Sequence, residues 1–168
     1  KTTALILYSI YFALTLIEFI MLLFGGMTVF EALNTAFATA GTGGFGFYNS
    51  SMGSFSPYLQ IVITVFMILF AINFNCYYML LCGKLREAFN LELRTFLIII
   101  ASVITVITIN IHGMFSSVGE ALRHSAFTVA SLISTTGFST VDFSQWPELS
   151  RALLVIIMFI GACAGSTG

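Results

Sequence analysis

Two short glycine-containing turns hold the residue types best suited to chemistry in this sequence. They run from Thr42 to Phe45 and from Thr135 to Phe138, read TGGF and TTGF, and lie about 90 residues apart. Glycine adopts backbone angles that other residues avoid, so such a turn can direct several carbonyl oxygens toward one point. Carbonyl oxygens can replace the water around a dehydrated cation. We therefore expect each turn to coordinate a cation through main-chain oxygens.

The composition of the turns indicates which cation they suit. Neither turn contains a carboxylate, so neutral oxygens would favour a weakly hydrated monovalent ion over calcium or magnesium. Gly44 and Gly137 are expected to shape the loops, and Phe45 and Phe138 to wedge them against neighbouring helices. The ion-binding candidates are Thr42, Gly43, Gly44, Thr135, Thr136 and Gly137.

A short capped helix is predicted before each turn. Thr28 and Glu31 form the pattern T-x-x-E, and Ser117 and Glu120 form S-x-x-E; both patterns are typical of a capping box at a helix start. We expect helices over about 28–40 and 118–133, too short to cross a bilayer. Their C-terminal ends carry a partial negative charge, which favours cations near the turns.

Longer apolar segments flank these units and place the chain in a membrane. Of the 168 residues, 58% are hydrophobic and only 8% are charged. Apolar spans precede each short helix, and Pro57 and Pro147 open returning helices, of which the first is expected to cross continuously to Leu81. Chain that enters a membrane and turns back must line a polar path or be buried in protein. We expect an all-α, multi-pass protein of the cell membrane with re-entrant loops.

Composition also disfavours several other classes of protein. The formal charge of −1 offers no basic surface for nucleic acid. Three cysteines show no metal-binding spacing, and no nucleophile stands with a base and an orienting carboxylate. We expect neither an enzyme nor a bound cofactor, with lipid as the surroundings.

The two capped helices, the turns and a small-residue run, GACAGSTG at 161–168, together resemble the Trk/Ktr/HKT superfamily of potassium-uptake proteins, in particular the TrkH/KtrB-like membrane subunits. The resemblance covers nearly the whole chain. It implies four membrane–pore–membrane repeats around one pore, each with a selectivity filter loop, and potassium, with or without sodium, as the transported ion. By position in the motif, Gly44 and Gly137 would be the key filter glycines.

The resemblance also implies how this chain is divided. Residues 1–82 would form one repeat with its filter loop at about 41–46, and 83–94 a cytoplasmic linker. Residues 95–168 would form an incomplete second repeat with its filter loop at about 134–139. Both ends of the sequence are read as cuts in a longer protein, so that these are the family's second and third repeats.

A gate and protein partners are further implications of the resemblance. The segment Gly161, Ala162, Cys163, Ala164, Gly165, Ser166, Thr167 and Gly168 would interrupt the last helix beneath the filter. A homodimer and a cytoplasmic nucleotide-binding regulatory subunit (TrkA/KtrA-like) would complete the assembly.

Other interpretations of these features remain open at this stage. A secondary transporter with broken helices carrying a small solute would also place interrupted helices in mid-membrane, although many such folds use inverted repeats. The turns could instead be simple packing corners. Glu18, inside an apolar span, is either an ion or proton site or a buried structural carboxylate. The pattern G-x-G-x-x-G at 41–46 follows a predicted helix, not a strand, which disfavours dinucleotide binding.

Overall fold

The computed structural model describes residues 1–43 and 53–162, and within these ranges every regular element is a helix. The first copy of the repeated unit contains α1 (Thr2–Phe24), α2 (Val29–Ala40), α3 (Pro57–Ala71) and α4 (Phe74–Leu81). After the short α5 (Leu85–Ala88), the second copy contains α6 (Leu91–Ile111), α7 (Val118–Ile133) and α8 (Glu148–Ile160). Two 3₁₀ turns, η1 (His112–Met114) and η2 (Phe143–Gln145), lie in the connections. This confirms the predicted all-α class.

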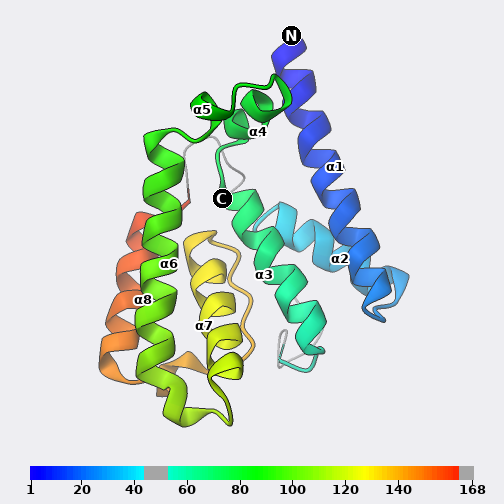
Figure 1. Cartoon of the computed structure of the whole chain (residues 1–168). Coiled ribbons are helices and arrows are strands. Elements are labelled where there is room, and N and C mark those ends of the chain that lie inside the picture. The colour runs from blue at the N-terminus through cyan, green and yellow to red at the C-terminus, as the bar shows by residue number, and fades with distance from the viewer. Residues whose placement is uncertain (44–52, 163–168) are drawn as a thin grey trace.

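The two copies have the same orientation. In Figure 1, α1 and α6 both descend from the top of the molecule, whereas α3 and α8 both rise from the bottom. In chain order, the short helices α2 and α7 come between the descending and rising helices of their own copy. The chain therefore contains a direct repeat of the order long helix, short helix, returning helix.

Within residues 1–43 and 53–162, two helices are long and apolar enough to cross a membrane on their own. They are α1 and the stretch Leu91–Met114, with mean hydropathies of 2.1 and 2.2. In each helix, less than a third of the most apolar stretch of 18 residues is buried inside the protein. Their outer faces are therefore suited to lipid or to further protein.

The returning helix of the first copy is broken, which corrects the prediction of one continuous span to Leu81. Helices α3 and α4 meet at an angle of 88°. The Asn73 side chain accepts a hydrogen bond from the Asn75 N–H at 2.9 Å and so caps a new helix. Tyr77 closes the bend by donating its hydroxyl proton to the Leu69 carbonyl oxygen at 2.5 Å. The hydropathy of this segment gives no sign of the break because both arms are apolar.

The start of α6 also differs from prediction. The helix begins at Leu91, inside the expected 83–94 linker, because the Asn90 side chain accepts a hydrogen bond from the Leu93 N–H at 2.9 Å. Asparagine is among the best N-cap residues, and this cap extends the helix over the charged residues Glu92 and Arg94.

The caps of the two short helices are similar but not identical. Thr28 and Glu31 form the complete predicted capping box. At α7, Ser117 accepts from the Glu120 N–H at 3.2 Å, but the Glu120 carboxylate binds Ser116 instead of completing the box. The hydrogen bond from Ser116 lowers the pKa of Glu120. Both patterns thus mark a helix start, as predicted.

The apolar core joins the two copies. Helix α3 packs against both α2 and α7. One buried cluster includes Ala40 at the end of α2, Phe66 of α3, Phe127 of α7 and Phe138 in the second loop. Phe138 is only 2% exposed. The second loop is therefore anchored in a core that belongs largely to the first copy.

Candidate ion-binding loops and gate segment

The first candidate loop begins where α2 ends in a left-handed turn. Thr42 has φ of +52°, and its N–H donates to the Thr39 carbonyl oxygen at 3.3 Å. The Gly43 N–H donates to the Ala38 carbonyl oxygen at 2.8 Å. This pair of hydrogen bonds, with a left-handed residue after the C-cap, is a Schellman motif. Gly44 and Phe45 lie outside the described residues.

The second loop begins with the same motif at the end of α7. Thr135 has φ of +63°, and its N–H donates to the Leu132 carbonyl oxygen at 3.2 Å. The Thr136 N–H donates to the Ser131 carbonyl oxygen at 3.0 Å. The two short helices therefore end in matching hydrogen bonds and matching backbone angles.

Both left-handed positions are occupied by threonine where glycine would be expected. A β-branched residue with positive φ is rare, because its side chain crowds the backbone, and it costs about 1–2 kcal/mol. Thr42 and Thr135 are the two non-glycine residues with positive φ in the described part of the chain. Strain of this kind concentrates at functional sites. Its occurrence at the same place in both copies favours a common role for the two turns.

Hydroxyl groups hold the second loop in place. The Ser131 hydroxyl donates to the Phe138 carbonyl oxygen at 2.6 Å, and both groups are buried. The Ser134 and Thr136 hydroxyls form a hydrogen bond of 2.8 Å. Thr136 is 3% exposed, so its side chain faces the protein. The hydroxyl groups of Ser131 and Ser134 thus hold the loop from the side that faces the protein interior.

Exposure separates the residues of the second loop into two groups. Thr135 and Gly137 are exposed, whereas Thr136 and Phe138 are buried. Gly137 has φ of +86°, and a Cβ built on it would meet no atom within 4 Å. Glycine is required there by backbone angle and not by lack of space. The buried Phe138 is placed as the predicted wedge would be, although that role stays a prediction.

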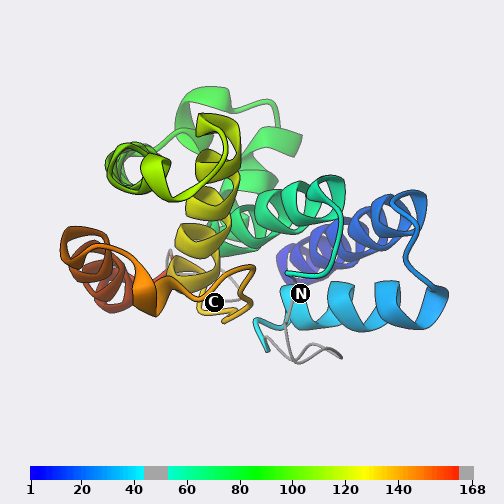
Figure 2. The same cartoon turned by 90° about the horizontal axis from the view of Figure 1, so that it is seen from below.

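The ends of α2 and α7 face a common region. In Figure 2 their C-terminal ends lie on the same side of α3, with the second loop beside them. Neither helix has a basic residue in its last turn to offset the partial negative charge of its end. The described residues contain no group of three or more His, Cys, Asp or Glu side chains that could hold a metal ion. Any cation here would meet helix ends and neutral oxygens.

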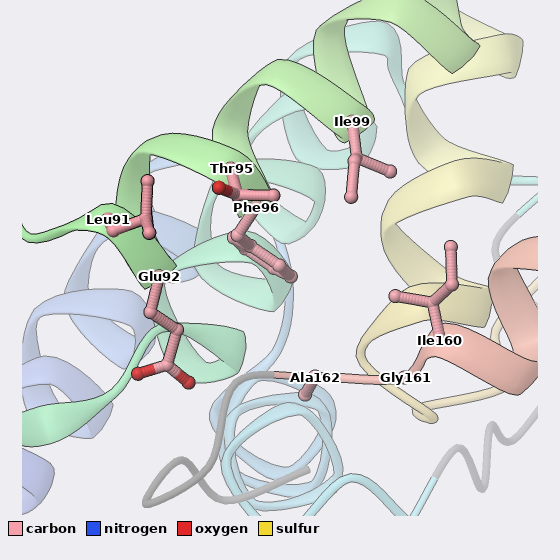
Figure 3. A pocket seen from close by; sticks show the side chains of 8 residues that line it. All are labelled: Leu91, Glu92, Thr95, Phe96, Ile99, Ile160, Gly161 and Ala162. Atoms are coloured by element: carbon pink, nitrogen blue, oxygen red, sulfur yellow. The ribbon is translucent and has the colours of Figure 1, made fainter.

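The predicted gate begins where α8 ends. Gly161 has φ of +66° and ψ of −167°, a conformation that only glycine adopts readily. Of the predicted segment, Gly161 and Ala162 are described, and 163–168 lie outside the described residues. A pocket of about 430 Å³ separates this end from the start of α6. Figure 3 shows Ile160 and Ala162 on one side of it and Glu92 and Phe96 on the other.

Comparison with known proteins identifies the family. The profile of the TrkH family, described as cation transport protein, matches residues 1–168. The chain belongs to the TrkH family. It is 33% identical to the Trk system potassium uptake protein TrkH of Escherichia coli K12, over 99% of this chain and 35% of that protein. It is also 33% identical to TrkG of the same organism, over 84% of this chain.

A solved structure agrees with this assignment. The crystal structure of the potassium transporter TrkH from Vibrio parahaemolyticus superposes with a TM-score of 0.91 at 32% identity, covering 99% of this chain and 37% of that one. The TrkH family chain described here therefore spans about a third of the length of the relatives it matches. The family resemblance inferred from the two turns and the small-residue run is confirmed.

Glu18 in this TrkH family chain is a fully buried residue of α1, facing α2. Its carboxyl group lies beside the Thr39 hydroxyl. That hydroxyl donates its proton to the Thr35 carbonyl oxygen at 2.8 Å, and no bond of normal geometry joins it to the Glu18 carboxyl. Complete burial with no hydrogen-bond partner for either carboxyl oxygen fits an ion or proton site as well as a structural carboxylate, so both interpretations of Glu18 stand.

Sequence reasoning missed one polar contact near the loops. Arg123 of α7 donates from Nε to Oε1 of Gln60 in α3, at 3.0 Å. These residues are 63 positions apart in the TrkH family chain, and Gln60 sits in an apolar helix. A polar residue within an apolar returning helix is the only sequence signal that could have drawn attention to Gln60.

Proposed function

We propose that the protein to which this chain belongs carries potassium across the cell membrane through a filter lined by main-chain oxygens. The observation that carries this proposal is the matched pair of left-handed threonines, Thr42 and Thr135, at the ends of α2 and α7. Each turn releases the chain into a predicted filter loop at the partially negative end of a helix. Potassium transport is also what the names of the TrkH and TrkG relatives state for those proteins.

In this proposal the coordinating groups are carbonyl oxygens at 42–44 and 135–137. Exposure of Thr135 and Gly137 supports this choice. The Thr136 hydroxyl is already bonded to Ser134, so Thr136 would contribute through its carbonyl oxygen. Because a pore must be enclosed on all sides, the two loops of this chain would supply part of the filter, and further repeats of the whole protein the rest.

The remaining parts of the proposal concern regulation and assembly. The segment 161–168 would act as a gate below the filter, and the glycine conformation at Gly161 supports a break in the helix there. The whole protein would reside in the inner or plasma membrane as a homodimer with a TrkA/KtrA-like regulatory subunit. No cofactor or catalysis is proposed.

A broken-helix transporter of a small solute is the second candidate. The bend between α3 and α4 favours it, because such transporters contain interrupted helices. Its binding site would use side chains at the bend. However, the Asn73 side chain there caps α4. The direct order of the two copies in Figure 1 also differs from the inverted repeats common in such transporters.

The test is rubidium uptake into liposomes that contain the intact protein. We expect uptake above that of empty liposomes, with potassium competing better than sodium. Gly137→Ser should reduce both uptake and the preference for potassium over sodium, because serine is strained at φ of +86°. Uptake and preference that survive this substitution would remove Gly137 from the filter. A solute-driven uptake that is indifferent to potassium would favour the second candidate.

A further inference from the structure

Gln60 bridges two parts of the molecule that belong to different copies. It is 3% exposed, near the start of α3. Its Oε1 accepts the bond from Arg123 Nε at 3.0 Å, and its Nε2 donates to the Phe55 carbonyl oxygen at 3.2 Å. Arginine only donates and a carbonyl only accepts, so this orientation of the amide satisfies both ends. The side chain therefore ties α7 to the segment that enters α3.

The contact continues from Arg123 to His124. The Arg123 Nη2 lies 3.4 Å from His124 Nε2, and the Glu120 carboxylate lies 3.9 Å from the same nitrogen; in the neutral tautomer that leaves Nε2 without a proton, Nε2 accepts from Arg123. Nδ1 then carries the proton of the neutral ring and donates to the Thr140 hydroxyl oxygen at 2.8 Å. His124 is 6% exposed and stacks on Phe115 with ring centroids 5.0 Å apart. Its orientation is thus fixed on both edges and on one face.

One end of this series of hydrogen bonds lies next to the second candidate loop, and the other lies at the entry to α3, which packs against α2, the helix that leads into the first loop. Phe55 lies on the return from the first loop into α3, and Thr140 comes two residues after Phe138 of the second loop. We call Phe55, Gln60, Arg123, His124 and Thr140 the inter-loop network. It crosses the interface between α3 and α7, which pack together closely. The hydrogen bonds of this network are part-buried and involve a charged group, so breaking one would leave a partly desolvated polar group without its partner.

We infer that Arg123 and Gln60 are positioning residues that hold the two filter loops at a fixed spacing and thereby set the preference for potassium over sodium. This inference rests on the proposed function. The two ions differ in size, so selection by carbonyl oxygens depends on where those oxygens are held. A loop anchored only within its own copy could shift against the other. The inter-loop network removes that freedom without touching the ion.

The experiment is a double-mutant cycle on the full-length protein in liposomes. The variants are Gln60→Met, which keeps side-chain length, Arg123→Met, which keeps only the unbranched apolar stem, and the pair; all of them remove the hydrogen bonds between the two residues. The measured quantity is the ratio of the sodium to the potassium concentration that half-inhibits rubidium uptake. Gln145→Met and Arg151→Met are matched controls, since both residues are exposed and outside the network. Thermal unfolding midpoints are recorded for every variant.

We expect each single variant to lower this ratio by about 2- to 30-fold. The double variant should lower it no further than the larger single effect, because both substitutions break one linkage. The controls should keep the wild-type ratio. A ratio that stays at the wild-type value in the single variants, or single effects that multiply in the double variant, would overturn the inference. A lower unfolding midpoint with an unchanged ratio would also overturn it, by making the contact purely structural.

A second substitution covers the case in which a methionine variant does not fold. Gln60→Glu keeps an acceptor for Arg123 but loses the donor to the Phe55 carbonyl oxygen. The inference predicts a lowered ratio, and an unchanged ratio would overturn it, because the linkage through Gln60 would then have no effect on ion preference. Failure of the inference is distinct from failure of the proposed function: in the first case wild-type protein still takes up rubidium with potassium preference, and in the second it does not.

Discussion

Thr42 and Thr135 adopt the same left-handed backbone conformation, with φ of +52° and +63°, one residue after the C-caps of α2 and α7. In each case the following residue donates its N–H to a carbonyl oxygen five residues earlier. The equivalence extends to both angles and hydrogen bonds, so it describes a repeated structural device.

Gly137→Ala should be destabilising and should impair selective uptake. Alanine at φ of +86° costs about 1–2 kcal/mol, although there is open space for its methyl group. The measurements are the thermal unfolding midpoint in detergent and the potassium preference of rubidium uptake. Gly113→Ala is the matched control, because Gly113 also has open space and has no positive φ. If both variants behave alike, the left-handed backbone at Gly137 is unimportant.

Thr135→Gly should relieve backbone strain. The gain of about 1–2 kcal/mol from the left-handed region is partly offset by the flexibility of glycine in the unfolded chain, about 0.5–1 kcal/mol. We expect an unfolding midpoint equal to or above that of the wild type. Thr136→Gly serves as the contrast, since Thr136 is buried and bonded to Ser134 and has no positive φ, and it should be destabilising. A large loss of stability in Thr135→Gly would mean that its side chain makes essential contacts.

Ser131→Ala should weaken the second loop selectively. The buried Phe138 carbonyl oxygen would lose its hydrogen bond of 2.6 Å, at a cost of about 1–3 kcal/mol. Ser9→Ala is the control, because the Ser9 hydroxyl bonds only to its own helix and is exposed. We expect a lower unfolding midpoint and a reduced potassium preference in Ser131→Ala alone. Equal midpoints for the two variants would contradict the anchoring role of Ser131.

Ser117→Ala should cost about 1 kcal/mol through loss of the N-cap of α7. Thr28→Ala should cost at least as much, because it also removes the hydrogen bond that the Thr28 hydroxyl donates to the Glu31 carboxylate at 3.1 Å, while the backbone half of the capping box remains. The comparison of unfolding midpoints distinguishes the complete capping box from the partial one. A larger loss for Ser117 would indicate that the Ser116–Glu120 contact depends on the cap.

The sequence predicted those features that follow from local patterns. The cap residues Thr28 and Ser117 mark the helix starts because capping is a local interaction, and the repeated turns led to the correct family. The bend before Phe74 was missed because hydropathy is the same on both sides of it. Glycine was expected to supply the unusual backbone angles of the turns. In the structure, Thr42 and Thr135 also adopt positive φ. No sequence pattern indicates which threonine adopts such a strained conformation.

Contacts between the copies were beyond sequence reasoning for a different reason. The bond between Gln60 and Arg123 joins residues that are distant in the chain. A single sequence, considered without aligned relatives, gives no sign that two such residues are in contact. The apolar anchoring of Phe138 in the core of the first copy is of the same kind. Local chemistry therefore predicted the candidate site, and packing between the copies determines how its two halves are held.

The most direct measurement is the anomalous scattering of rubidium in crystals of the full-length protein grown with rubidium in place of potassium. If the two loops form part of the filter, a rubidium peak will lie between them, with carbonyl oxygens at 42–44 and 135–137 around it, and the peak will weaken when potassium is added back. A peak at the side chains of the α3–α4 bend, or none between the loops in crystals of a protein that transports rubidium, would contradict it.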